Sequence, residues 1–257
     1  MTTPVGRLYL VPNTLDFATA GAAADIRELL PLRSLRIAAA LEHWVCENAK
    51  TTRTFLKRVD AVCPLAKPLQ VLAIVELPRP AKGRSVDAGV STDVVALLAP
   101  VLAGHDLGLI SEAGLPALAD PGARLVGAAH AASIGVVALP GASAVSLAVA
   151  ASGLDGQSFA FVGYVPSEAV ARAARLRDLE VMSRQRAQTQ VMIETPYRNQ
   201  ALLDALVSSL QPRTVLAVSV GLTLASEFTR SGPIAQWRMA PATLPADVPA
   251  VFSILAR

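Results

Sequence analysis

Two short segments combine glycine, proline and polar residues in the pattern of ligand-binding turns. The first is Ser111-Glu112-Ala113-Gly114-Leu115-Pro116, followed by Asp120-Pro121-Gly122, and the second is Pro140-Gly141-Ala142-Ser143-Ala144. Each follows a short apolar run that predicts a buried strand. Because helix N-termini and loop amides converge at the carboxyl ends of strands in parallel α/β sheets, both segments are candidate ligand-binding loops.

The residue types in these segments suit S-adenosylmethionine as a ligand. Gly114 and Gly141 let the backbone approach a ligand closely, beside turns that prolines stiffen. Backbone groups can then hold the adenine edge and the methionine carboxylate, and a carboxylate or carbonyl can accept hydrogen bonds from the ribose diol. Ser143, at a helix start, adds a hydroxyl. For either segment alone, the alternative is a tight strand-to-helix turn with a capping serine.

Alternation of short Val-, Ile- and Leu-rich runs with amphipathic stretches predicts an α/β fold whose parallel sheet is covered on both faces. The strands expected in the first half are residues 7–11, 35–41, 70–77, 107–111 and 135–139. One helix is expected from a Ser91 cap through Leu102, and another from an Asp120 cap with Pro121 at its first position. A third is expected from a Ser143 cap to Gly153.

A different pattern follows Gly153. An aromatic strand, residues 159–164, leads through Pro166 into a long charged helix with Ser167 as its cap. Further strands are expected at residues 190–194, 214–220 and 250–255, with a helix at residues 198–210. We therefore expect two domains, residues 1–140 and 141–257, and an exposed loop at residues 78–89.

Four motifs, in order, resemble those of a known family. The run from Leu109 to Gly122 resembles the S-D-A-G-x-P-x-x-x-D-P-G signature of the ribosomal RNA 2′-O-ribose methyltransferase branch of the tetrapyrrole methylases. Three later runs resemble that branch's P-G-P-S-A … A-S-G-L, F-x-F-x-G-F-L-P and Y-E-S-P-H-R motifs, at residues 139–154, 159–166 and 193–198. Four motifs with compatible spacing over about half of the chain are far more specific than one.

The resemblance implies two α/β domains of the tetrapyrrole methylase type, with a cleft for S-adenosylmethionine between them, in a homodimer. It implies that the cofactor is bound by Ser111, Glu112, Ala113, Gly114, Leu115 and Pro116, by Pro140, Gly141, Ser143 and Ala144, and by Phe161, Val162, Gly163 and Tyr164. The implied acceptor is a ribose 2′-hydroxyl of 16S ribosomal RNA or the small ribosomal subunit.

The chain departs from the family pattern on the acceptor side. Residues 11–16 read V-P-N-T-L-D and lack the glycine of the family's P-I-G-N-x-x-D loop, and Glu47-Asn48-Ala49-Lys50 replaces E-D-T-R. Glu112 stands where an aspartate is usual. These differences indicate a divergent subgroup, so two alternatives stay open: methylation of a tetrapyrrole or other small molecule, and a non-catalytic domain that only binds S-adenosylmethionine.

Methyl transfer to a ribose hydroxyl requires alignment and a group that either accepts the hydroxyl proton or stabilises the developing alkoxide. Glu112 is the first candidate for this base or for a ribose clamp, and the alternative is a carboxylate that only orients ligand or caps a helix. Glu47, with Lys50, is the second candidate. Arg198, inside the last motif, is expected to contact the acceptor or the other domain.

Composition bounds the remaining possibilities. The net charge of +3 permits an anionic partner. Basic residues at 50–58 and along the helix after residue 167 either neutralise RNA phosphates or form solvated helix faces. Two cysteines and three scattered histidines predict neither a disulfide nor a metal site. The uncharged stretch between Arg124 and Asp155 is interrupted by glycine and proline, so we expect no membrane span and a cytoplasmic location.

Overall fold

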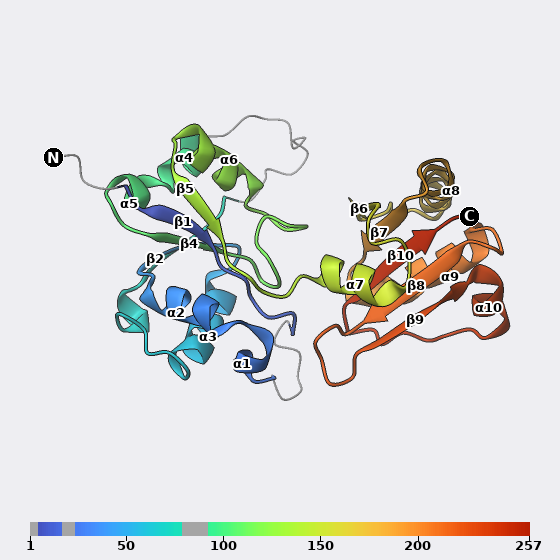
Figure 1. Ribbon diagram of the computed structural model, residues 1–257, viewed down its shortest axis with the longest axis horizontal. Helices are drawn as coiled ribbons and strands as arrows, with labels where there is room; N and C mark the ends of the chain where they lie inside the picture. The colour runs from blue at the N-terminus through green and yellow to red at the C-terminus, as the bar shows by residue number, and fades with distance from the viewer. Residues whose placement is uncertain (1–4, 17–23, 79–91) are drawn as a thin grey trace. The chain divides into compact units, whose positions relative to one another are not determined.

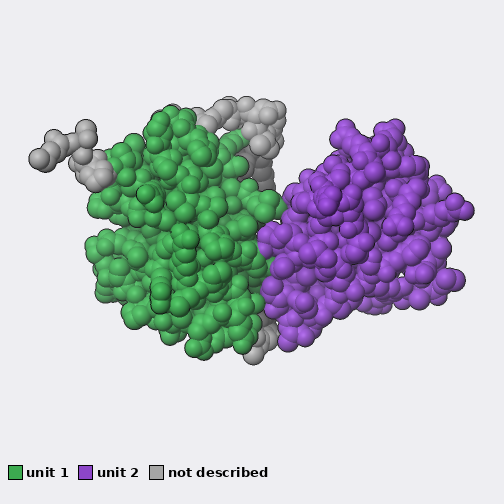
Figure 2. All heavy atoms as spheres, in the orientation of Figure 1, with its two compact units in different colours: residues 1–17, 24–142 green, residues 18–23, 143–257 purple. Residues whose placement is uncertain are grey.

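The computed structural model describes residues 5–16, 24–78 and 92–257, and the chain divides into two compact units (Figures 1 and 2). Unit 1 comprises the described residues up to Ala142, and unit 2 runs from Ser143 to Arg257. Each unit contains one five-stranded sheet. The expected loop at 78–89, apart from Pro78, and the expected cap Ser91 lie outside the described residues.

Unit 1 is built on a wholly parallel sheet in the order β3-β2-β4-β1-β5. Its strands are β1 Arg7–Leu10, β2 His43–Cys46, β3 Ala73–Glu76, β4 Leu107–Ile110 and β5 Gly135–Ala138. One face is covered by α1 Ile26–Leu29, α2 Leu32–Ala40 and α3 Ala49–Asp60. The other is covered by α4 Thr92–Ala96, α5 Ala99–Leu102 and α6 Ala123–Ala131. The expected doubly covered parallel sheet is confirmed for this unit.

Successive residues of β4 show how the two faces are filled. Leu107 and Leu109 are buried against α4, α5 and α6, whereas Ile110 is buried against α1, α2 and α3. Between them, Gly108 faces the indole ring of Trp44, and a Cβ at that position would lie 2.7 Å from the ring. A glycine is therefore required where Trp44 crosses the centre of the sheet.

Three expectations for the first half are wrong. Residues 35–41 are not a strand but mostly α2, because Leu35, Ala38 and Ala39 are buried at helical spacing. The expected strand at 70–77 contains only β3, after a 3-10 turn, η1 Leu69–Val71. The helix expected to reach Leu102 is two helices, since Pro100 cannot occupy a helix interior.

Unit 2 has a mixed sheet in the order β6-β7-β10-β8-β9. Strand β6 Phe159–Gly163 is parallel to β7 Thr189–Ile193, whereas β10 Ala250–Leu255, β8 Val215–Val220 and β9 Phe228–Pro233 join by antiparallel pairing. Its helices are α7 Ala144–Ser152, α8 Ala169–Arg186, α9 Asn199–Ser209 and α10 Ile234–Met239, with the 3-10 turn η2 Pro196–Arg198. The sequence pattern does not predict β9 or α10.

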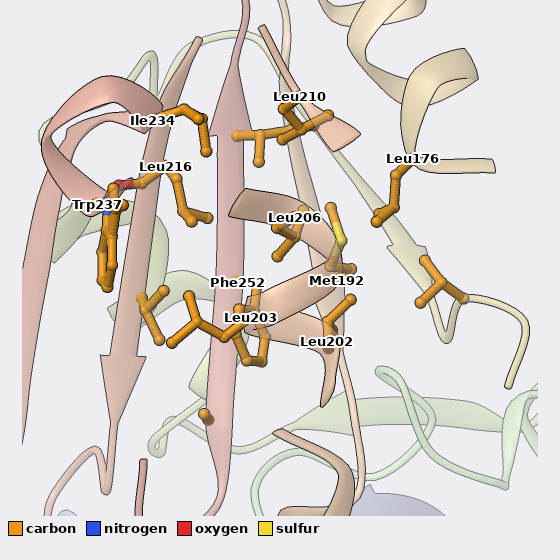
Figure 3. Close-up of a cluster of buried hydrophobic side chains, with 14 of the residues drawn as sticks. Leu176, Met192, Leu202, Leu203, Leu206, Leu210, Leu216, Ile234, Trp237 and Phe252 are labelled. Carbon is orange, nitrogen blue, oxygen red and sulfur yellow. The ribbon is translucent and has the colours of Figure 1, made fainter. Parts of the chain in front are cut away.

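The main core of unit 2 lies between its sheet and α8, α9 and α10. Figure 3 shows Phe252 of β10 and Met192 of β7 packed with leucines from α9 and with Trp237 of α10. The neighbouring strand residues Val191 and Val251 point to the other face and pack against α7. Helix α7 ends at Gly153 with φ +69°, as expected.

The cap expected for α8 is wrong by one residue. Glu168, not Ser167, accepts hydrogen bonds from the Val170 and Ala171 amides. A carboxylate also interacts favourably with the positive end of an 18-residue helix.

Candidate functional site

At the carboxyl ends of β1 and β4, the chain turns toward opposite faces of the unit 1 sheet. The two strands are neighbours, but the helices after β1 pack on one face and α6, after β4, packs on the other. In open α/β sheets, loops that diverge in this way leave a crevice where ligands bind. The two loops here are residues 11–16 and 111–122.

Asn13 joins these two loops. Its backbone N–H donates to the Gly114 carbonyl at 2.9 Å, and its side-chain Nδ2 donates to the carbonyls of Ser111 at 3.1 Å and Glu112 at 2.9 Å. Asn13 is buried, and Gly114 has φ +67°, a conformation that favours glycine. Asn13, considered only as a family departure in the sequence, is thus what fixes the 111–116 loop.

Arg58 of α3 holds the loop after β1 through an ion pair and hydrogen bonds. Its Nη1 lies 3.0 Å from both Asp16 Oδ2 and Thr14 Oγ1, and its Nη2 donates to the Ala24 carbonyl at 2.9 Å. The guanidinium is therefore committed to positioning this loop. The other basic residues of the 50–58 cluster, Lys50, Arg53 and Lys57, are exposed on α3.

The Pro140-Gly141 turn, which follows β5, packs on the same loop. A Cβ at Gly141 would lie 2.3 Å from Pro12 Cβ, and the Pro140 carbonyl accepts from Ser34 Oγ at 2.8 Å. The absence of a side chain at Gly141 is what allows this approach. Unit 1 therefore brings together the predicted residues 111–116, Pro140 and Gly141.

Three carboxyl groups surround the start of the 111–116 loop. Glu47, which follows β2, accepts from the Glu112 backbone N–H at 3.2 Å, and burial raises the pKa of Glu47. Burial and the charge of Glu47 raise the pKa of Asp120 to about 7, the charge of Glu112 adds to the rise, and the polar Ser111 side chain opposes it. Asn48, beside Glu47, caps α3 through its side chain.

This arrangement corrects the role expected of Asp120. Helix α6 begins at Ala123 after Gly122, whose φ of +127° makes the turn, so Asp120 caps no helix. Half-buried carboxyl groups that lie close together favour a cationic ligand, and a group that titrates near pH 7 can accept a proton under physiological conditions. The position of Asp120 in the motif was the one sequence signal for this role.

The remaining predicted residues lie in unit 2. Ser143 is buried at the start of α7 but makes no side-chain capping bond, and Ala144 is the first helical residue. Phe161, Val162 and Gly163 end β6, whose pairing with β7 is irregular between Phe161 and Gly163. Tyr164 follows and is exposed.

Arg198 is held by the turn after β7. Its Nε and Nη2 donate to Glu194 Oε1 at 3.0 and 2.6 Å, and this buried carboxylate raises the pKa of Arg198. The same oxygen accepts from the backbone N–H and hydroxyl of Thr195. Tyr164 lies near enough to interact electrostatically with Arg198. The guanidinium is thus held by Glu194 and Thr195 at the carboxyl end of β7.

Other chemistry finds little support within the part of the chain that the structure describes. The rings of His43 and His105 lie 4.9 Å apart, but no three His, Cys, Asp or Glu side chains there could hold a metal ion. Cys46 and Cys63 are free thiols. Among the described residues, no helix is long and apolar enough to cross a membrane.

A doubly covered parallel sheet, joined to a second α/β unit, is the architecture of known methyltransferases. Uroporphyrin-III-C-methyltransferase from Thermus thermophilus aligns with a TM-score of 0.50 and 20% identity over 97% of this chain and 92% of its own. The methyltransferase CobJ aligns with a TM-score of 0.56 and 15% identity over 98% and 94%. These likenesses establish the fold.

Sequence comparison then gives the family. The family model for Tetrapyrrole (Corrin/Porphyrin) Methylases matches residues 19–237, and the chain belongs to this family. Ribosomal RNA small subunit methyltransferase I of Mesorhizobium japonicum is 32% identical over 88% of this chain and 67% of its own length. The protein of the same name from Streptococcus pyogenes serotype M1 is 31% identical over 88% and 68%. The family and branch indicated by the motifs are confirmed, and the chain is a methyltransferase.

Proposed function

We propose that this methyltransferase takes its methyl group from S-adenosylmethionine and transfers it to a ribose 2′-hydroxyl of RNA in the small ribosomal subunit. The observation that carries the proposal is the convergence of three loops and three carboxyl groups, those of Glu47, Glu112 and Asp120, at one edge of unit 1. The names of the curated relatives support ribosomal RNA as the acceptor.

The residues at this edge fit the cofactor. S-adenosylmethionine supplies an electrophilic methyl group on a sulfonium cation. Backbone groups of residues 111–116 and of the Pro140-Gly141 turn provide donors and acceptors, and the bare Cα of Gly141 leaves its backbone uncovered. The nearby carboxyl groups suit a ligand that carries positive charge and a ribose diol. The assignment of Ser143, Ala144 and residues 161–164 to the cofactor stays a prediction from the resemblance.

The reaction needs a proton acceptor for the hydroxyl, and we assign it to the carboxyl cluster. Glu112 remains the first candidate, either as the base or as the ribose clamp. Asp120 becomes an equal candidate, because a pKa of about 7 suits proton transfer at neutral pH. Glu47 is assigned a positioning role, since it already accepts the Glu112 amide hydrogen. Arg198 is assigned to positioning the turn after β7 rather than to the acceptor.

The acceptor is tested by incubating the protein with labelled S-adenosylmethionine and, separately, small ribosomal subunits, free 16S RNA and the small-molecule fraction of a cell extract that lacks the protein. Label in RNA alone supports the proposal. Label confined to small molecules would contradict the acceptor and favour the tetrapyrrole-type alternative. Cofactor binding without any transfer would favour a non-catalytic module, and no binding in titration calorimetry would refute the cofactor.

Two substitutions separate the candidate bases. Glu112→Gln is expected to lower the rate of transfer at least about 100-fold while leaving cofactor affinity within about threefold, if Glu112 accepts the proton. Glu28→Gln, at an exposed position on α1, is the matched control. Near-normal turnover of Glu112→Gln, with loss of turnover in Asp120→Asn, would move the base to Asp120.

A further inference from the structure

Unit 2 contains an arginine-rich groove that shares no residue with those assigned to methyl transfer. The groove, with a volume of about 560 Å³, is lined by Arg177, Glu180, Val181, Arg184, the 211–214 segment and Arg257. The 211–214 segment leads into β8, and Arg257 follows β10 (Figure 1). We call this surface the arginine groove.

The sheet topology separates the arginine groove from the Glu194–Arg198 turn. Residue Val215 of β8 pairs with Leu255 of β10, and Ile254 pairs with Gln190, near the amino end of β7. The turn that holds Arg198 follows the opposite, carboxyl end of β7. Strand β7 has five residues, so the two places lie roughly 17 Å apart at about 3.3 Å per residue. The groove is therefore a separate site.

Among the residues that the structure describes, the side chains of the groove arginines have no partner. The guanidinium groups of Arg177, Arg184, Arg213 and Arg257 make no hydrogen bond or ion pair there. Three other arginines of the same unit are engaged: Arg198 by Glu194, Arg230 over the Trp237 ring, and Arg238 by the carbonyls of Val207 and Leu210. The groove therefore gathers four guanidinium groups on one surface, whereas Arg175 and Arg186 of α8 do not line it.

Glu180 holds the two walls of the groove together. It is 4% exposed and accepts from the Gln211 backbone N–H at 2.8 Å and from the Thr214 hydroxyl. This buried carboxyl fixes the 211–214 segment against α8. Arg213 is thereby held beside the face of α8 that carries Arg177 and Arg184. The lining of the groove thus contains one acidic side chain, which is already hydrogen-bonded, and four arginines, so its side chains carry a net positive charge.

The spacing suits a chain of phosphates. Arg177 and Arg184 lie seven residues apart on one face of α8, which corresponds to about 10 Å at 1.5 Å per residue. A nucleic acid strand rises about 3.4 Å per nucleotide, so this length spans about three nucleotides. Guanidinium forks match phosphate oxygens, and the lining contains no aromatic side chain on which a base could stack. Contacts of this kind position a backbone without reading its sequence.

We propose that the arginine groove binds the phosphodiester backbone of the RNA substrate, through residues other than those assigned to methyl transfer. The proposal rests on the proposed function in that it takes RNA to be the substrate. It assigns to unit 2 a second RNA contact that does not depend on the RNA sequence. For part of the arginine series along α8, it favours phosphate binding over a solvated helix face, the two interpretations that the sequence allows.

The test compares two double substitutions that remove equal charge. Arg184→Ala with Arg213→Ala empties part of the groove, and Arg186→Ala with Arg33→Ala removes two exposed arginines that lie outside it and have no partner among the described residues. Binding of a fluorescently labelled 16S RNA fragment is measured by anisotropy across a salt series. Loss of two phosphate contacts should reduce the steepness of the plot of log affinity against log salt by about 1.4. Between 1 M and 0.1 M salt, the groove variant should therefore gain about 25-fold less affinity than the wild type.

The control pair is expected to change affinity less than about threefold, because charges outside the groove make no phosphate contact and act only through screened, diffuse attraction. Equal losses in both pairs would overturn the groove as a specific site, even if the wild-type protein methylates RNA. A wild-type protein that neither binds nor methylates RNA would refute the proposed function and the groove's ligand together. If the groove variant lost binding of ATP but bound RNA as the wild type does, the ligand of the groove would be a small phosphate compound and not RNA.

Discussion

Replacing Asp120 with asparagine removes the carboxyl group whose pKa burial and Glu47 raise from 3.8 to about 7. Between these two values the folded protein holds a proton on Asp120 that the unfolded chain has released. The free energy of unfolding of the wild type therefore falls as pH rises from about 4 to about 7, and Asp120 adds no further pH dependence above that. An asparagine has no such proton, so the variant lacks this decline.

The magnitude follows from the interval between the two pKa values. About 3 pH units correspond to roughly 4 kcal/mol at 1.36 kcal/mol each. Asp120 is only partly buried, and solvent screening reduces this to about 2 kcal/mol. The difference in free energy of unfolding, Asp120→Asn minus wild type, should therefore be about 2 kcal/mol more positive at about pH 8 than at about pH 4.

Urea unfolding followed by tryptophan fluorescence measures this difference in stability for unit 1, which contains Asp120. The chain has two tryptophans, Trp44 buried in unit 1 and Trp237 buried in unit 2. In a Trp237→Phe background the emission of Trp44 reports the unfolding of unit 1, which contains Asp120. Glu28→Gln, at an exposed position on α1 of unit 1, is the control and should shift unfolding equally at both pH values. A pH-independent difference for Asp120→Asn would refute the carboxyl cluster.

Two further predictions concern the edge of unit 1 that we propose binds the cofactor. Gly141→Ala places a methyl group 2.3 Å from Pro12 Cβ, so we expect a loss of about 1–3 kcal/mol in stability and at least about tenfold weaker cofactor binding by calorimetry. Gly127→Ala, in open space on α6, should instead stabilise by about 0.5–1 kcal/mol. Binding of the cationic cofactor at about pH 7 should release a proton from Asp120, seen as a buffer-dependent binding enthalpy that Asp120→Asn abolishes.

The loops that carry the motifs could be predicted because their signals are local. Glycine and proline after an apolar run mark a strand end, and the α7 helix between Ser143 and Gly153 follows from its flanking residues. The alternation of strands and helices likewise predicts the doubly covered sheet of unit 1. Short apolar runs are ambiguous, however, and the strand expected at 35–41 is a helix because Ala38 and Ala39 pack on a helical face.

The interior of the site depends on contacts between distant segments, which no local pattern reveals. Asn13 fixes the 111–116 loop only because β1 and β4 are neighbours in the sheet. Glu47 changes the pKa of Asp120 only because β2 lies on the other side of β4. The basic cluster on α3 shows the same limit, since Arg58 is engaged by Asp16 while its neighbours are exposed.

Methyl transfer to the 2′-oxygen is the central claim, and the fate of the labelled RNA under alkali tests it most directly. Small ribosomal subunits or 16S RNA are incubated with the protein and labelled S-adenosylmethionine, and the recovered RNA is hydrolysed with alkali. A methyl group on a 2′-oxygen blocks attack on the adjacent phosphodiester, so the label should appear in alkali-resistant dinucleotides. Label in mononucleotides would place the methyl group on a base, and unlabelled RNA beside labelled small molecules would contradict an RNA acceptor.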